Sequence, residues 1–251
     1  MSIAPYSEPV PAAQSSLAHA CLMAPEVRSL RALQARLVDR IKRAAIVHLH
    51  ASERGERLLL RMYHDAEEAS QSILVEQLDQ QSENWVMRQI RRHLAEEEAH
   101  TALFAAALDA RGTGSRSRLA PSGLSRRKLA RWRKLANRHA PYFAQGALVP
   151  AYATALCAEQ MAVRIMHRHC DTIGPDHALY ALFSGVLADE HRHARLCAHT
   201  LQRLVAPHEA QRLDILLAEV RRIDAAFGVS GAVAMYVAGL AARALPGGRA
   251  R

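Results

Sequence analysis

The stretch at residues 187–196, LADEHRHARL, places a carboxylate three residues before an imidazole, at Glu190 and His193, within apolar residues that recur every three or four positions. One such pair is weak evidence in a chain with 14 histidines. A second stretch, LAEEEAHTALF, repeats the spacing at Glu97 and His100, again in an apolar helical pattern. Residues three apart share one face of a helix, so each pair presents a carboxylate and an imidazole together.

The distance from each pair to the nearest turn predicts what it meets on the neighbouring helix. Glu190 lies about 15 residues after the turn at residues 174–175, which corresponds to about 22 Å along a helix. The same distance back along the preceding helix reaches Glu159, the only acidic residue in the range 110–170. The two side chains are therefore expected at one depth of a helical hairpin.

The polar segment DQQSE, residues 79–83, allows the same count on the earlier hairpin. Counting the same number of residues on each side of this turn places Glu97 opposite Glu67 or Glu68 on the preceding helix. Glu67 continues an apolar stripe that includes Tyr63, whereas Glu68 follows the polar side of the helix, so we select Glu67. Tyr63 itself is expected to be a core tyrosine whose hydroxyl has a hydrogen-bond partner.

Four carboxylates and two imidazoles at one depth of a bundle would cost much free energy through desolvation and repulsion unless cations neutralise them. Two divalent metal ions would do so. Carboxylate and imidazole donors favour iron, with manganese or a mixed pair as the alternative. The candidate metal ligands, which would also form the catalytic centre, are Glu67, Glu97, His100, Glu159, Glu190 and His193.

Composition predicts an all-α fold, because Ala, Leu, Arg and Glu dominate and aromatic residues make up only 5%. We expect a four-helix bundle with metal-binding helices at about residues 52–110 and 148–205. Additional N- and C-terminal helices and a long crossover between the second and third bundle helices complete it. Residues 26–251 are expected to form one domain, and residues 1–25 a disordered arm.

The C-terminal segment predicts two helices, at residues 213–227 and 232–245. Its stretch 225–242 is long enough to span a bilayer but consists mostly of Ala and Gly, so we expect a packed helix and no membrane association. The four cysteines lack metal-binding spacing and the chain starts without a signal-peptide pattern, which predicts a cytoplasmic protein. Cys157 and Cys197 are expected to be small core residues.

The formal charge of +9 is unevenly distributed, since residues 110–158 contain ten Arg or Lys and no Asp or Glu. This basic crossover suits an acidic carrier protein that presents a tethered substrate, or it is a solvated connection. Nucleic acid is disfavoured, because Trp132 is the only aromatic residue in the basic helix expected at 124–139. A homodimer is compatible with the sequence.

Over roughly residues 52–205, the sequence resembles the ferritin-like di-iron carboxylate superfamily. The stretches EEEAHTALF, LVPAYATALCAEQMAVR and LADEHRHARL are most similar to di-iron oxygenases of the p-aminobenzoate N-oxygenase type. The resemblance implies a ferritin-like bundle and two iron ions that, once reduced by an electron donor, bind O2 and transfer oxygen to a small molecule. That N-oxygenase type has an additional histidine ligand one turn before the last glutamate, where this sequence has Val186.

Three function classes follow. The leading prediction is an O2-dependent oxygenase or oxidase that N-oxygenates or hydroxylates a small molecule, free or carrier-bound. An iron oxidation and storage protein is one alternative, and a tRNA-modifying di-iron hydroxylase is the other.

His93, one turn before Glu97, occupies the position that corresponds to Val186 in the other hairpin. It could be a seventh ligand, a hydrogen-bond partner of a carboxylate, or an exposed histidine. The polar surroundings, RQIRRHLAEEE, favour the exposed histidine.

Overall fold

The computed structural model describes residues 30–78, 84–112 and 123–244 of the 251-residue chain. Every regular element in these residues is a helix, and no strand occurs among them. The predicted all-α fold class is therefore confirmed for the described part of the chain. The arm expected at residues 1–25 lies outside the described residues.

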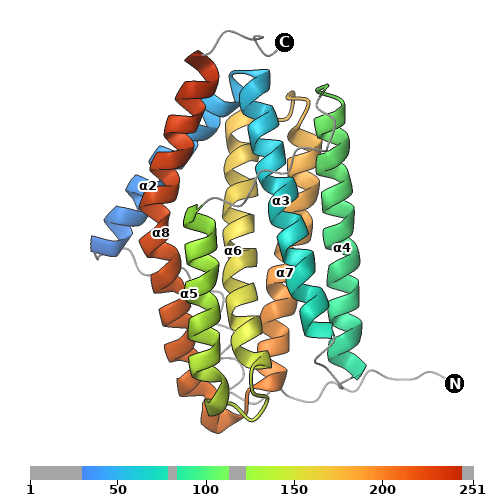
Figure 1. Ribbon diagram of the computed structural model, residues 1–251, viewed down its shortest axis with the longest axis vertical. Coiled ribbons are helices and arrows are strands. Elements are labelled where there is room, and N and C mark those ends of the chain that lie inside the picture. Colours follow the sequence, from blue (N-terminus) through green and yellow to red (C-terminus); the bar gives the residue numbers. More distant parts are fainter. Residues whose placement is uncertain (1–29, 79–83, 113–122, 245–251) are drawn as a thin grey trace, which may run out of the picture.

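Four long helices lie side by side and form the body of the molecule (Figure 1). α3 (Glu53–Leu78) and α4 (Asn84–Asp109) make one antiparallel hairpin, and α6 (Leu148–Ile173) and α7 (Tyr180–Leu204) make the other. The hairpins meet where α4 packs on α7. These are the helices that the sequence predicted to carry the candidate ligands.

Local contacts fix the start of α3. Ser52 Oγ accepts a hydrogen bond from the backbone N–H of Gly55 at 3.1 Å, which satisfies one of the free donors of the first turn. Glu53 and Glu56 place negative charge in that turn, where the helix dipole favours it. A Cβ at Gly55 would lie 2.1 Å from the carbonyl oxygen of Leu49, so only glycine fits this close approach.

The turn between α6 and α7 falls where the sequence predicts it. α6 ends at Ile173 and is followed by Gly174, whose positive φ of 71° glycine adopts readily, and then by Pro175. The residue count that predicted Glu159 and Glu190 at one depth therefore starts from a turn that the structure contains.

Two apolar clusters fill the bundle on either side of a polar layer. One surrounds Leu60, Phe104 and Phe183, near the end of the bundle where α3 begins. The other surrounds Leu156 and Leu201 and includes residues of α5 and α8. Along α4, α6 and α7 the candidate ligands lie between residues of the two clusters. Burial of this apolar surface offsets the cost of the polar layer.

Three further helices pack outside these four. α2 (Leu30–His50) and α8 (Ala210–Ala244) pack along each other, and α5 (Gly123–His139) lies in the crossover against α8 and α6. Two short 3₁₀ helices, η1 (Ala140–Tyr142) and η2 (Pro207–Glu209), lie in the connections.

α8 is one continuous helix, so the prediction of two C-terminal helices was wrong. Residues 228–231 suggested a break, but a glycine in a helix interior costs only about 1 kcal/mol relative to alanine. Packing along α2 offsets that cost. A Cβ at Gly239 would lie 3.0 Å from His48 Cβ and 3.1 Å from the carbonyl oxygen of Ala45. Glycine at this position of α8 therefore allows close approach to α2.

Residues 207–244 form the one helical segment of the described chain that is long and apolar enough to cross a membrane. Length and composition alone are weak support for a membrane span. One side of α8 packs on α2, while Val229, Val233, Val237 and Leu240 are exposed. The cytoplasmic location and the absence of membrane association stay predictions.

Candidate metal centre

Seven buried His and Glu side chains gather in the polar layer. α4 and α7 each contribute a Glu-x-x-His pair, α4 adds a further histidine, and α3 and α6 contribute one glutamate each. All seven side chains belong to residues that are at most 8% exposed. They are Glu67, His93, Glu97, His100, Glu159, Glu190 and His193. The structure therefore brings together all six residues selected from the sequence and adds His93.

The seven residues form two groups in which the ligand atoms lie within 4.8 Å of one another. The two-histidine group is His93, Glu97, Glu159 and His193, and the one-histidine group is Glu67, Glu97, His100 and Glu190. Ligand atoms about 2.0–2.4 Å from one ion lie within about 4.8 Å of each other. Each group therefore has the size of one metal site, and Glu97, common to both, is placed to bridge them.

In the two-histidine group, both imidazoles direct a nitrogen at the same two carboxylates. His93 Nε2 lies 3.0 Å from Glu97 Oε1 and 3.5 Å from Glu159 Oε1. His193 Nδ1 lies 3.2 Å from Glu97 Oε1 and 3.8 Å from Glu159 Oε2. The four side chains come from three helices and converge on one point.

In the one-histidine group, His100 Nδ1 lies beyond hydrogen-bond distance from two of the carboxylates. His100 Nδ1 lies 3.9 Å from Glu67 Oε2 and 3.8 Å from Glu190 Oε1. Neither separation is a hydrogen bond, and His100 Nδ1 has no hydrogen-bond partner among the described residues. This spacing leaves room for an ion between the imidazole and the two carboxylates.

The outward nitrogens of the two motif histidines meet carboxylates that the sequence analysis missed. His100 Nε2 on α4 lies 3.0 Å from Asp189 Oδ2 on α7, and His193 Nε2 on α7 lies 2.8 Å from Glu96 Oε2 on α4. The two contacts are reciprocal, because each carboxylate directly precedes the motif glutamate of its own helix. A carboxylate on the outer nitrogen orients the ring and leaves Nδ1 for a metal ion. The available signal was an acidic residue directly before each Glu-x-x-His.

Several buried polar atoms of the site have no hydrogen-bond partner among the described residues. They are Glu97 Oε2, His100 Nδ1, Glu190 Oε2 and His193 Nδ1. A buried unpaired polar group costs about 1–3 kcal/mol, and folded proteins keep such groups rare. Metal ions in the two groups would give these atoms partners. The side chains present therefore fit divalent metal ions, without fixing which metal.

Burial determines which carboxyl groups carry protons when metal is absent. Burial raises the pKa of Glu159 to about 8 and raises the pKa values of Glu67 and Glu190 well above their usual range. Burial acts on Glu97 in the same direction, but the facing imidazoles of His193 and His93 outweigh it and hold its pKa below the usual range. The metal-free centre thus keeps one ionised glutamate, and metal binding must displace the protons of the other three.

His93 is buried, with 3% of its surface exposed, so the expectation of an exposed histidine was wrong. The charged residues around it in the sequence lie on the outer side of α4, whereas His93 and Glu97, one turn apart, share the inner side. The 3.0 Å separation from Glu97 fits both remaining alternatives, a ligand or a hydrogen-bond partner. Glu68, the alternative to Glu67, belongs to a separate and partly exposed group.

A chain of buried hydrogen bonds begins at Tyr63, one helical turn before Glu67 on α3. Tyr63 Oη lies 2.5 Å from His169 Nε2, and His169 Nδ1 lies 2.9 Å from His50 Nε2. His50 Nδ1 faces Glu56 Oε1 at 3.3 Å. Burial lowers the pKa of His169 to about 3, so its neutral ring accepts a hydrogen bond from the Tyr63 hydroxyl. The Tyr63 hydroxyl has the partner that the sequence analysis expected.

His50, Glu56 and His177 form a third group with the spacing of metal ligands. Its only carboxylate is already paired, because Arg111 Nε donates to Glu56 Oε2 at 2.9 Å and His177 Nε2 lies 3.1 Å from Glu56 Oε1. This group therefore does not need a metal ion to neutralise it.

Cys157 and Cys197 are buried core residues, as expected from the sequence. Burial raises the pKa of the Cys157 thiol to about 11 and that of Cys197 well above the usual range. Both thiols stay protonated at neutral pH, and neither belongs to a candidate metal-ligand group.

No protein family model, curated protein or solved structure matches this chain.

Proposed function

We propose that this protein is a non-haem di-iron oxygenase or oxidase with a ferritin-like bundle, which uses O2 to N-oxygenate or hydroxylate a small molecule. The observation that carries the proposal is the pair of buried His/Glu groups joined by Glu97. Ferritin-like proteins hold two iron or manganese ions with one glutamate from each of two helices and a Glu-x-x-His from each of the other two. Two iron ions bound here would supply the reduction of O2 and the oxygen transfer.

The two groups differ at one position of each hairpin, and this difference suggests where substrate approaches. His93 lies one turn before Glu97 on α4, and Val186 lies at the equivalent position, one turn before Glu190 on α7. His93 completes the two-histidine group from α4, whereas Val186 lacks a donor atom and packs in the apolar cluster of Phe104 and Phe183. An ion in the one-histidine group would therefore keep open positions. We propose that O2 and the substrate approach it from this apolar side.

The surrounding residues have defined roles in this proposal. Glu96 and Asp189 hold the outer nitrogens of the two motif histidines, so that Nδ1 of each ring points inward. Glu67, Glu159 and Glu190, whose pKa values burial raises, would have to release protons in order to hold metal ions. The apolar clusters above and below the polar layer exclude water, which strengthens electrostatic interactions inside.

Anaerobic iron loading followed by exposure to O2 tests the proposal. We expect about two iron ions per chain and an absorbance change after O2 whose decay the substrate accelerates. Glu159→Ala and Glu190→Ala should each lose iron, whereas Glu98→Ala, at an exposed position of α4, should keep it. Unchanged iron content in both site variants would overturn the proposal.

The two alternative functions give different results in the same experiment. Iron uptake that continues beyond the two groups would indicate storage, and turnover that depends on added tRNA would indicate a tRNA hydroxylase. Neither alternative has a specific observation in the described residues that favours it.

A further inference from the structure

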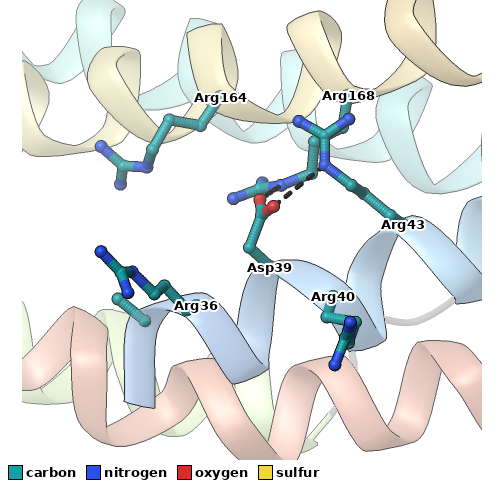
Figure 2. Close-up of a pocket in the computed structure, with 7 residues that line it drawn as sticks. Arg36, Asp39, Arg40, Arg43, Arg164 and Arg168 are labelled. Carbon is teal, nitrogen blue, oxygen red and sulfur yellow. Dashed lines mark hydrogen bonds and ion pairs between the residues drawn. The ribbon is translucent and has the colours of Figure 1, made fainter. Parts of the chain in front are cut away.

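A cationic pocket lies between α2 and α6, on the outer surface of α6 (Figure 2). It is an open depression of about 540 Å³. Its polar lining residues are Arg36, Asp39, Arg40, Arg43, Arg164 and Arg168. None of them belongs to the metal centre, so the pocket is a separate feature of the molecule.

Asp39 binds two of these arginines. Arg43 Nε lies 2.9 Å from Asp39 Oδ2, and Arg168 Nε lies 2.5 Å from Asp39 Oδ1. Arg43 also lies 2.9 Å from Asp171, so this half of the pocket has its charge balanced by carboxylates. An anion bound between α2 and α6 would compete with Asp39 for the guanidinium groups of Arg43 and Arg168.

In the other half of the pocket, the arginine charges are not balanced by an equal number of carboxylates. Arg164 lies 3.5 Å from Asp224, a carboxylate that also pairs with Lys128. Arg36 and Arg40 are exposed and have no carboxylate within ion-pair distance in the described chain. Figure 2 shows the guanidinium groups of Arg36 and Arg164 on one side of Asp39, facing the same open space from opposite helices.

Lys42 adds a further, largely buried, positive charge near Arg168 and Arg164. Burial and the neighbouring Arg168 lower the pKa of its amine to about 8. Like charges gathered in this way repel one another, and a bound anion would relieve that repulsion.

We propose that the pocket between α2 and α6 binds a phosphate group, as inorganic diphosphate or as a phosphate monoester. The planar forks of arginine match phosphate oxygens in bidentate geometry, which one ammonium group cannot do. One carboxylate, Asp39, occupies only Arg43 and Arg168. A group with more charge and more oxygens is needed to reach Arg36 and Arg164 as well.

Calorimetric titration of the full chain with inorganic diphosphate tests the proposal. Arg36→Ala combined with Arg164→Ala should weaken diphosphate binding by about tenfold or more. The matched control is Arg126→Ala with Arg127→Ala, which removes the same charge from exposed positions of α5 and should change the affinity by less than about twofold. Iron content should be unchanged in both, so failure here is distinguishable from failure of the proposed function.

Asp39→Asn gives a result that structural damage would not imitate. The substitution frees Arg43 and Arg168, so diphosphate should bind several-fold more tightly. Glu53→Gln, which removes an exposed carboxylate at the start of α3, should leave the affinity unchanged. Weaker binding by Asp39→Asn would contradict the proposal.

Further titrations identify the source of the phosphate group. Phenyl phosphate that binds more tightly than inorganic phosphate would assign the pocket to an organic monoester, and equal affinities would assign it to the free anion. Either result supports the proposal. It is overturned if sulfate or chloride at equal ionic strength abolishes binding, if both double variants weaken it equally, or if only duplex nucleic acid binds.

Discussion

At the scale of single residues, His93 makes the two groups unequal. Its imidazole lies within 3.5 Å of both Glu97 and Glu159, and the related position in the other hairpin is an apolar valine. A buried imidazole is costly unless its ring nitrogens have a hydrogen-bond partner or a metal ion. The two possible roles of His93 have different consequences for metal affinity.

We predict that His93→Ala weakens the binding of one of the two ions and leaves the other in place. As a direct ligand, His93 should contribute more than the roughly 10–100-fold in affinity typical of a residue that only orients a ligand. Anaerobic iron titration would measure this, with His191→Ala, at an exposed position of α7, as control. A loss of only about 10–100-fold would show that His93 hydrogen-bonds Glu97 and is not a ligand, and two ions bound with unchanged affinity would contradict the prediction.

Glu96→Gln and Asp189→Asn test the reciprocal contacts between α4 and α7. Each should lower metal affinity by about 10–100-fold, because the facing imidazole loses the carboxylate that fixes its ring. Glu98→Gln alters the same helix at an exposed position and should have no effect. Equal affinities in all three variants would contradict the assigned role of Glu96 and Asp189.

The candidate ligands could largely be predicted from the sequence, because a helix converts residue number into depth. Glu159 is the only acidic residue in a long stretch, so its position could be counted from the turn. The spacing of His93 from Glu97 made a ligand one of its possible roles, but its polar sequence neighbours favoured an exposed side chain. Only its contacts with Glu159 on α6 and His193 on α7 show that it faces inward. Glu96 and Asp189 needed knowledge of how α4 and α7 face each other.

At the scale of elements, α6 joins the metal centre to the outer helices. Its inner face carries Glu159, and further along it carries His169, which connects Tyr63 on α3 with His50 at the end of α2. The His169 ring also stacks on Phe183 of α7 at 4.4 Å between centroids. One polar side chain therefore ties together four helices at one end of the bundle.

Replacing His169 with phenylalanine should keep the stacking and remove both hydrogen bonds. The Tyr63 hydroxyl and His50 Nε2 would each lose a buried partner, at about 1–3 kcal/mol per group. Denaturant unfolding would measure the loss. His167→Phe, on the exposed side of α6, should change the free energy of unfolding by less than about 0.5 kcal/mol. The same small change in both variants would show that the network adds no stability.

The positions of the helices could be predicted where capping residues and the period of apolar residues mark their ends. The turn after α6 has a glycine with positive φ directly after the helix and a proline after that, a pattern that predicts a helix end. Residues 228–231 show the opposite case, because a run with two glycines continued as a helix. The compensating contact between α8 and α2 joins residues far apart in the sequence, so local propensity could not reveal it.

At the scale of the whole molecule, a polar layer of seven titratable side chains separates two apolar clusters. Ions that bind only the folded chain stabilise it in proportion to their affinity. Without them, burial forces three glutamates to hold protons. The stability of the molecule should therefore depend on both metal and pH.

We predict that the metal-free protein loses stability as the pH rises from about 4.5, the usual pKa of an unfolded glutamate, to about 8. Burial raises the pKa of Glu159 to about 8, and those of Glu67 and Glu190 are also raised. A carboxyl with a raised folded pKa stabilises the fold fully below its unfolded pKa, and that contribution disappears as the pH rises through the folded pKa. Glu97 has a lowered pKa, and its contribution would be lost only under acid conditions.

Thermal unfolding with a chelator, measured across this pH window, checks the prediction. The unfolding midpoint should fall as the pH rises, and added Mn²⁺ should remove the fall, because bound ions replace the lost protons. A metal-free midpoint that rises or stays constant would contradict the assigned protonation of the centre.

The most direct measurement for the central claim is the anomalous scattering of iron in crystals grown from the iron-loaded protein. Two peaks about 3.5–4 Å apart are expected, one in the two-histidine group and one in the one-histidine group, with Glu97 touching both. A single peak, a peak only among His50, Glu56 and His177, or no peak in the polar layer would contradict a dinuclear centre.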